Sequence, residues 1–401
     1  MVEANLPAQF LQTLKPRLPE MLAVLRRLVL AESPSFQKSA ADRCCRLLEA
    51  EWRRRGARVE RLGQKLRGDH LRIIWWPHKS RPAGQLLVLG HYDTVYSTGT
   101  LATMPFRITA GKAYGPGVFD MKAGIVQALF AFSALKNSAA PLRKRLVFLW
   151  TSDEEIGSES SRKFIESEAR RSDAVFVLEP SLGPRGLLKT ARKGVGEAEI
   201  IVHGRASHAG LAPEEGINAV HELARQITRI EKWNNPRRGI TINADIIEGG
   251  TRTNVIAERA RAVLDLRVLR SADMRRIEKR LLALHPILPG ARIEKRLLAL
   301  HPILPGARLE VRGGFNRVPL ERKFSAALFA RAKSLAAQMG LPLGECVAGG
   351  GSDGNLTAAL GIPTLDGLGA VGDGAHSAHE HIFINTMPAR AALLAALLAT
   401  T

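Results

Sequence analysis

Several apolar runs of this sequence end in side chains that can bind a metal ion or carry a proton. These side chains are His91 and Asp93 after the first run, Glu154 and Glu155 after the second, and Glu179 after the third. A further acid, Asp120, follows a Gly-Pro-Gly turn. Taken alone, each acid is explained as well by a solvated position in a loop as by a role in a site. Gathered in one place they would repel one another unless a cation neutralised them, and a mixed His, Asp and Glu set suits zinc, cobalt or manganese.

The elements that must bring these residues together are the strands and a helix of an α/β layer. The apolar runs at 86–89, 146–150 and 174–178 predict buried strands, and residues 121–136 predict a helix between the first two. Such strand–helix alternation is typical of a largely parallel sheet. Because ligands of open α/β sheets bind beyond the carboxyl ends of the strands, we expect the histidine and the acids at one edge.

A second group of elements indicates a separate, smaller α+β domain. Residues 194–202 predict a strand, 217–230 a helix, and 239–247 and 260–268 two half-buried strands. This order of strand, helix and two strands leads us to expect a domain of residues 193–311.

The remainder of the chain is expected to return to the first domain. It contains a predicted helix near 324–339, a glycine-rich turn at 349–354 and a terminal helix from about Pro388. The first domain is therefore expected to be discontinuous, made of residues 1–192 and 312–401.

The smaller domain contains a tandem repeat. Residues 277–292 read IEKRLLALHPILPGAR, and residues 293–308 read the same 16 letters. Repeat architectures need several diverged copies to build a stacked core, so two identical copies indicate a recent duplication. We expect it to add a helix or loop without a functional role.

The composition is that of an ordinary globular protein with an unusual charge. The 401 residues include 58 Lys and Arg against 38 Asp and Glu, a formal net charge of +20. The three cysteines form no CxxC pair, no apolar run reaches the roughly 18 residues of a membrane-spanning helix, and the N-terminus lacks a signal-peptide pattern. These features favour a cytoplasmic protein with no membrane partner.

The positive charge allows three kinds of partner: nucleic acid, an acidic surface or an acidic substrate. Aromatic residues make up only 5% of the chain, and no nucleic-acid-binding motif is present. A nucleic-acid-binding protein is therefore the less favoured alternative. A basic exterior that steers small anionic substrates towards a metal site is the favoured interpretation.

Linked motifs give the sequence a resemblance to a known family. They are HYDTV at 91–95, GPGVFDMKAG at 115–124, DEEIG at 153–157 and Glu179-Pro180. Their order and spacing resemble the co-catalytic zinc peptidases of family M20, which include glutamate carboxypeptidase, acetylornithine deacetylase, succinyl-diaminopimelate desuccinylase and aminoacylase. The resemblance extends from about residue 20 to the end and is strongest to the glutamate carboxypeptidase branch. It implies a mostly parallel catalytic domain with an inserted dimerisation, or lid, domain.

The resemblance also implies a site for two divalent metals, with zinc the expected ion and cobalt or manganese as alternatives. Asp120 would bridge them, His91 and Glu179 would hold one, and Glu155 and His376 the other. Among the three histidines of GAHSAHEH at 374–381, the family pattern favours His376 over His379, and His381 is expected either to pack in a strand or to lie at the surface.

Two acids would serve this metal pair without being ligands, according to the same resemblance. Asp93 would accept a hydrogen bond from the His91 ring and so fix its tautomer. Glu154 would act as general base towards a water shared by the metals.

The smaller domain would supply further groups, again by resemblance. In the segment GRASHAG, at 204–210, His208 would act in the partner subunit of a homodimer and stabilise the oxyanion. Asn254 would contact the oxyanion or substrate, and Arg267 would grip the free carboxylate of the substrate. The turn containing Gly350 would offer backbone N–H groups.

The expected activity is metal-dependent hydrolysis of an amide bond in a peptide or N-acyl amino acid with a free carboxylate. The alternative within the family is a small-molecule N-deacylase of the acetylornithine deacetylase or aminoacylase kind. The motifs do not separate these two activities.

Overall fold

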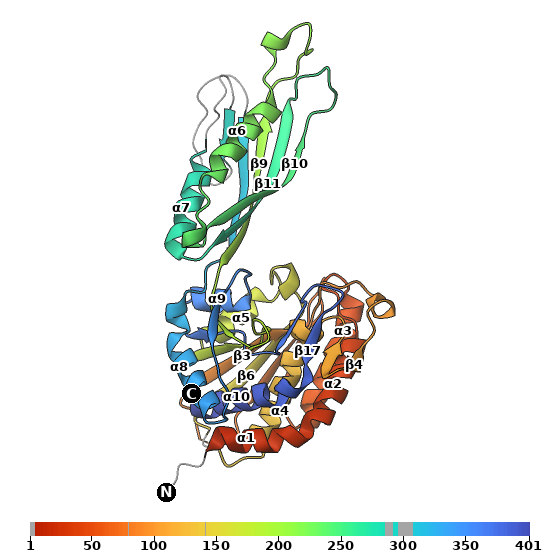
Figure 1. The fold of residues 1–401 in the computed structure, drawn as a ribbon, viewed down its shortest axis with the longest axis vertical. Coiled ribbons are helices and arrows are strands. Elements are labelled where there is room, and N and C mark those ends of the chain that lie inside the picture. The colour runs from red at the N-terminus through yellow and green to blue at the C-terminus, as the bar shows by residue number, and fades with distance from the viewer. Residues whose placement is uncertain (1–4, 79, 141, 285–291, 296–307) are drawn as a thin grey trace. The chain divides into compact units, whose positions relative to one another are not determined.

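A computed structural model describes the chain except for residues 1–4, 79, 141, 285–291 and 296–307. It divides into two compact units (Figure 1). The larger unit consists of Met1–Ala191, Leu320–Ala348 and Ser352–Thr401, and the smaller of Arg192–Pro319 and Gly349–Gly351. The smaller unit therefore ends eight residues beyond the expected 311, and it also includes three glycines that the sequence placed in the catalytic domain.

The larger unit is built on a six-stranded sheet. Its strands, in spatial order, are β1 (Arg58–Leu62), β2 (His70–Trp75), β6 (Arg145–Thr151), β3 (Gln85–His91), β7 (Ala174–Val177) and β15 (Thr364–Leu365). The β6–β3, β3–β7 and β7–β15 pairs are parallel, whereas β1–β2 and β2–β6 are antiparallel. The mostly parallel sheet is confirmed, and its central strands are the predicted apolar runs.

Both faces of this sheet are covered by helices (Figure 1). In β3, Leu86 and Val88 enter one core while Leu87 and Leu89 enter the other. Alternate side chains of a strand point to opposite faces, so a strand buried on both faces reads as a continuous apolar run. One core is formed with α1 (Leu6–Leu14), α2 (Leu18–Leu30), α3 (Lys38–Arg54), α4 (Ala123–Lys136), α8 (Ala326–Ala337) and α10 (Met387–Thr400), the other with α5 (Arg162–Ala169) and α9 (Asp353–Ala359).

The helical stretch Val118–Lys136 is longer than the sequence analysis expected, which found no apolar run of membrane-spanning length. Its 19 residues have a mean hydropathy of 1.4, which by length and composition is enough to cross a membrane. In the structure 94% of that window is buried inside the larger unit, where α4 packs against α10 and β3. A helix enclosed on all sides by protein is apolar all round.

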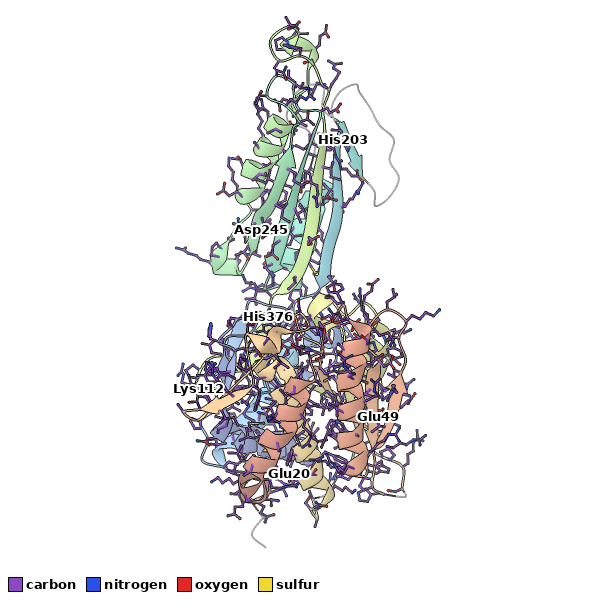
Figure 2. The ribbon with its side chains drawn as sticks, turned by 90° about the vertical axis from the view of Figure 1, so that its right-hand side faces the viewer. Glu20, Glu49, Lys112, His203, Asp245 and His376 are labelled. Carbon is purple, nitrogen blue, oxygen red and sulfur yellow. The ribbon has the colours of Figure 1, made fainter. Side chains whose placement is uncertain are left out.

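Smaller sheets complete the larger unit. A four-stranded sheet has the order β16 (Gly372–Asp373), β17 (His381–Phe383), β5 (Lys112–Tyr114) and β4 (Arg107–Thr109). A two-stranded sheet joins β14 (Glu345–Ala348) to β8 (Leu188–Arg192). Helices α2 and α3, which carry Glu20 and Glu49, lie on the flank of the unit shown in Figure 2.

The smaller unit has a five-stranded sheet with helices on one face. Its strand order is β10 (Thr241–Gly249), β11 (Arg259–Val268), β9 (Gly194–His203), β13 (Arg308–Arg317) and β12 (Arg292–Lys295). Helices α6 (Ala219–Glu231) and α7 (Ser271–Leu282) pack on this sheet around one apolar cluster. Because β13 pairs with β9 along its length, residues 312–317 belong to this sheet and the boundary lies later than expected.

The two repeat copies adopt different structures where they are described. The first copy begins inside α7, where Ile277 and Leu281 are buried one turn apart. The second begins in β12, an edge strand parallel to β13 with Arg292 opposite Arg308. The described part of the second copy is thus a strand and not the expected helix or loop, because a neighbouring strand, not local sequence, decides its conformation. The rest of the repeat lies outside the described residues.

Candidate metal centre

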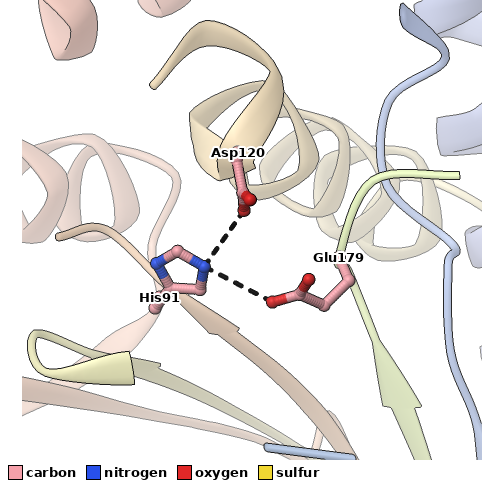
Figure 3. A group of neighbouring side chains, drawn as sticks. All are labelled: His91, Asp120 and Glu179. Atoms are coloured by element: carbon pink, nitrogen blue, oxygen red, sulfur yellow. Dashed lines mark ion pairs between the residues drawn. The ribbon is translucent and has the colours of Figure 1, made fainter. Parts of the chain in front are cut away.

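Three segments that are distant in sequence bring His91, Asp120 and Glu179 together (Figure 3). His91 is the last residue of β3, Asp120 lies in the irregular turn η3 (Val118–Lys122), and Glu179 follows β7. The Nε2 atom of His91 is 3.2 Å from Oδ1 of Asp120 and 3.4 Å from Oε1 of Glu179. The ends of two parallel strands and the turn before α4 therefore meet at one point.

A second group shares Asp120 with the first. Nε2 of His376 lies 3.5 Å from Oδ2 of Asp120 and 3.2 Å from both carboxylate oxygens of Glu155. The two oxygens of Asp120 consequently face different groups, Oδ1 towards His91 and Oδ2 towards His376. A carboxylate shared in this way can bridge two cations.

The atoms of the first group are arranged to bind a cation and do not satisfy one another by hydrogen bonding. His91 Nε2 and Asp120 Oδ1 are buried and make no hydrogen bond of acceptable geometry. A buried polar atom without a partner costs about 1–3 kcal/mol, and a coordinated metal removes that cost. His91, Asp120 and Glu179 would hold one divalent cation, and Asp120, Glu155 and His376 a second.

The His91 ring is oriented by the backbone of Asp93. Its Nδ1 is 3.1 Å from the carbonyl oxygen of Asp93 and 3.4 Å from Oδ1 of the same residue. The carbonyl, and not the expected carboxylate, is the nearer acceptor. In the neutral, metal-binding form of the ring, either acceptor places the proton on Nδ1 and directs the lone pair of Nε2 into the cluster.

The Asp93 carboxylate instead holds the turn that carries the two glutamates. Its Oδ1 accepts from the backbone N–H of Glu154 at 3.3 Å, and its Oδ2 from that of Glu155 at 3.3 Å. Ser35 Oγ also donates to Oδ2, at 2.7 Å. This fully buried acid thus fixes the start of the turn η4 (Glu154–Ile156).

Burial and mutual interaction shift the ionisation of the cluster. Burial raises the pKa of Glu155 to about 7 against the hydrogen bond from His376, and the charge of Asp120 adds to the rise. Hydrogen bonds to Asp120 and Glu155 raise the pKa of His376 to about 10. Burial would raise the pKa of Asp120, but His376 and His91 outweigh it and hold that pKa well below its usual range. Without metal, protons are therefore bound by side chains that would otherwise bind divalent cations.

The three C-terminal histidines have separate environments. His376 adopts a left-handed backbone conformation, φ +62°, uncommon outside glycine and found at functional sites. His379 is exposed and its Nδ1 lies 3.0 Å from Ser377 Oγ. His381 is buried in β17, with its ring 5.3 Å from that of Tyr114. Among the described residues, His376 alone of the three joins a candidate metal group.

We compared the sequence and the fold of this chain with those of known proteins. Residues 87–400 match the sequence model of peptidase family M20/M25/M40. The chain belongs to this family.

Two curated relatives and a solved structure illustrate the similarity. The chain is 30% identical over 387 residues to carboxypeptidase G2 of Pseudomonas sp. (strain RS-16), covering 95% of this chain and 89% of the relative. It is 30% identical over 276 residues to acetylornithine deacetylase of Erwinia tasmaniensis, covering 64% and 70%. Its fold resembles Bacillus subtilis YXEP, a dinuclear metal-binding M20 peptidase, with TM-score 0.69, 16% identity and 97% and 98% coverage. The chain is therefore an M20 metallopeptidase or amidohydrolase that hydrolyses amide bonds with metal.

In this M20 chain, His208 and Asn254 lie on neighbouring loops of the smaller unit. Nδ1 of the exposed His208 accepts hydrogen bonds from the backbone N–H groups of Gly210 and Leu211, both at 3.1 Å. The neutral ring therefore carries its proton on Nε2, which is left as a donor. The carbonyl of Asn254 accepts from Ala209 N at 3.0 Å, which keeps the two loops together.

Arg267 and Gly350, the other two expected substrate contacts, are also in the smaller unit. Nε of Arg267 donates to Asp265, with its oxygens at 2.9 and 3.0 Å, and Nη1 donates to the Gly349 carbonyl at 3.4 Å. The Gly350 carbonyl accepts from Nη1 of Arg192 at 3.1 Å. This bond involves the carbonyl of Gly350, and the expected role of the N–H groups of the turn stays a prediction.

Some described residues around the centre are not predicted by the sequence, among them Ser35, Tyr96 and Glu380. Ser35 and Tyr96 carry no sequence signal, because their hydroxyl groups serve partners far along the chain. Glu380 did carry one, since it is an acid in the same motif as His376.

Proposed function

We propose that this M20 enzyme cleaves the amide bond of a peptide or N-acyl amino acid that has a free carboxylate, with two zinc ions as cofactors. The observation that supports a two-cation site is the division of the Asp120 oxygens between two groups of ligands. Cobalt and manganese favour similar oxygen and nitrogen ligands, so they are the alternative ions.

The five proposed ligands are divided between the two cations. His91 and Glu179 hold the first cation, Glu155 and His376 the second, and Asp120 both. When bound, such a pair polarises a carbonyl oxygen and lowers the pKa of water.

Glu154 is the proposed proton carrier. It takes a proton from the attacking water and passes it to the leaving nitrogen. This role is supported by the hydrogen bond from its backbone N–H to Asp93, the residue that also accepts from the N–H of Glu155.

The smaller unit is proposed to recognise the substrate. Arg267 binds the free carboxylate, and its bond to Asp265 holds the guanidinium in one orientation. The Nε2–H of His208 stabilises the oxyanion, with Asn254 and the turn at Gly350 as further contacts. A net charge of +20 attracts such anionic substrates.

We also propose that the enzyme is a homodimer in which His208 acts in the active site of the partner subunit. β10 is at the edge of the five-stranded sheet, and it exposes Ile246 and Ile247 at 49% and 59%. An exposed apolar edge strand is a ready surface for pairing with a second copy. A cytoplasmic location is supported by three free cysteines.

The alternative activity is N-deacylation of a small acyl amino acid. The acetylornithine deacetylase relative supports it, although the similarity covers less of the chain than the carboxypeptidase match does.

A hydrolysis screen tests the proposed function. Dipeptides and N-acyl amino acids are incubated with the chelated protein, before and after addition of zinc, cobalt or manganese. We expect turnover only with added metal and only for substrates with a free carboxylate. Equal turnover of the substrate and its C-terminal amide would contradict the role of Arg267, and no metal-dependent turnover would contradict the function.

A further inference from the structure

A buried carboxylate with no assigned role lies beside the metal centre. The Glu380 side chain is fully buried in the larger unit. Its Oε1 accepts from the backbone N–H of Phe119 at 2.7 Å and of Asp120 at 3.0 Å. Its Oε2 accepts from the N–H of Gly117 at 3.1 Å and from the hydroxyl of Tyr96 at 2.6 Å. The carboxylate therefore receives four hydrogen bonds, which is its full capacity as an acceptor.

Three of these donors belong to the turn that presents the bridging ligand. Successive backbone N–H groups that converge on one anion form an anion-binding nest. Gly117 is required in this turn, because its φ is +70° and a Cβ would lie 2.4 Å from Thr94 Cγ2. Since the turn starts a helical stretch, its N–H groups also carry the positive end of the helix dipole. The backbone conformation of the turn that carries Asp120 is thus stabilised by a negative charge at the position of Glu380.

The same carboxylate is tied to the turn of the second histidine. Glu380 lies four residues after His376, and its own N–H donates to the Ser377 carbonyl at 3.1 Å. Tyr96 donates to Glu380 and also lies 3.1 Å from the Ser377 carbonyl. Asp120 and His376, which come from segments about 260 residues apart, are therefore connected through one buried group.

We propose that Glu380 is a positioning residue that sets Asp120 and His376 at the spacing required to hold the second cation. The inference rests on the proposed two-cation function. Glu380 acts on Asp120 through the backbone N–H of that ligand, and on His376 through the carbonyl of the adjacent Ser377, which its own N–H and the Tyr96 hydroxyl both contact. The cation held by Glu155 and His376 depends on both connections, whereas the cation held by His91 and Glu179 depends only on the placement of Asp120.

The substitution Glu380→Gln tests this inference through metal affinity. The amide oxygen can still accept from Phe119 and Asp120, but the new NH2 group would face the N–H of Gly117, so two donors would oppose each other. We expect one of two bound cations to weaken about 10–100-fold, the usual effect of changing a group that orients a ligand. Calorimetric titration of the metal-free protein with Zn²⁺ measures this, and the visible spectrum with Co²⁺ reports the changed geometry.

Two further variants separate positioning from general stability. Glu168 is also a buried acid of the larger unit, and it accepts hydrogen bonds from Arg72 at 2.8 Å and Gln85 at 3.0 Å. Glu168→Gln should lower the free energy of unfolding without changing either cation affinity. Tyr96→Phe removes one of the four donors and should weaken the same cation as Glu380→Gln, by a smaller factor. It also serves as the test if Glu380→Gln does not fold.

The outcomes distinguish the inference from the function on which it rests. Two cations in the wild type, with one selectively weakened by Glu380→Gln or Tyr96→Phe, would support the positioning role. Unchanged affinities for both cations in those variants would overturn it and leave the proposed function standing. Binding of fewer than two cations by the wild type would overturn both.

Discussion

Glu154 and Glu155 are neighbours in sequence but are given different tasks by their surroundings. Both N–H groups are held by Asp93, so the turn presents the two side chains from a fixed backbone. The Glu155 carboxylate reaches His376, and burial raises its pKa to about 7. We assign it to the metal and assign Glu154 to proton transfer.

Replacing each glutamate by alanine should therefore give different defects. Glu154→Ala should keep both cations and lower kcat about 10²–10⁴-fold, because only the proton carrier is removed. Glu155→Ala should lose a cation, because a ligand is removed. Metal analysis after gel filtration, together with kcat, checks both variants. The assignment fails if the two proteins retain the same metal content and full activity.

Metal binding should release protons in a pH range where ordinary histidines release none. A histidine must be neutral to bind metal, and the pKa of His376 is raised to about 10 by Asp120 and Glu155. The pKa of His91 is also raised well above its usual value: burial opposes the rise, but Asp120, Asp93 and Glu179 outweigh it. Below these pKa values a cation must displace protons, so affinity should keep rising with pH to about 10.

Calorimetry at pH 8 in buffers of different ionisation enthalpy counts the released protons. At least one proton should leave when both sites fill, because His376, whose pKa is raised to about 10, is protonated at pH 8. His379→Ala is the matched control and should leave this number unchanged, because His379 is outside both ligand groups. An affinity that stops rising above pH 7 would contradict the prediction.

The central sheet of the larger unit shows how adjacent strands can bring metal ligands together. β3 and β7 are adjacent and parallel, so their carboxyl ends bring His91 and Glu179 to one edge. Their side chains alternate between two apolar cores, which makes these strands rigid supports. Asp120 reaches the same edge from a turn, and that turn needs Glu380 to hold its N–H groups.

Removing one repeat copy should leave the elements of the smaller unit intact. Deletion of residues 277–292 or of 293–308 gives the same chain, because the copies are identical. The remaining copy can supply Ile277 and Leu281 to α7 and still lead into β13, while the edge strand β12 is lost. We expect kcat/KM to be unchanged and the Tm to shift by less than about 4 °C, as for a change under 1 kcal/mol. Loss of the folded protein would show that β12 is structurally required.

For the whole molecule, the proposed catalytic groups are divided between two compact units. The metal ligands and Glu154 are in the larger unit, whereas His208, Asn254 and Arg267 are in the smaller one. The proposed dimer brings His208 of one subunit to the metal centre of the other. An inactive subunit could then be rescued by a partner with a different defect.

Subunit mixing tests this arrangement. Glu154→Gln and His208→Ala proteins should each be nearly inactive, but an equal mixture that exchanges subunits should recover about a quarter of wild-type activity. Half of the dimers would be mixed, and each would contain one site with both groups intact. Mixing Glu154→Gln with Glu155→Ala is the control and should recover nothing, because both residues are contributed by the same subunit. The absence of recovery in the first mixture, despite verified exchange, would contradict action in the partner's site.

The sequence predicted much of this centre because its signals are local. Continuous apolar runs indicated the buried strands, and polar residues directly after them indicated the edge at which His91, Glu155 and Glu179 meet. The β1–β2 hairpin and the end of the smaller unit were missed. Both depend on which strand pairs with which, and such pairing is a contact between distant segments.

By itself the sequence determined the family, the order of the main elements and the residue types at the centre, since motifs and periodicity are properties of adjacent residues. Only the tertiary structure decided that the oxygens of Asp120 face two groups and that Glu380 holds its turn from 260 residues away. It also decided that the same letters, Ile-Glu-Lys, form a helix in one repeat copy and a strand in the other. The physical reason is that hydrogen bonding and burial depend on neighbours in space, and local sequence does not specify those neighbours.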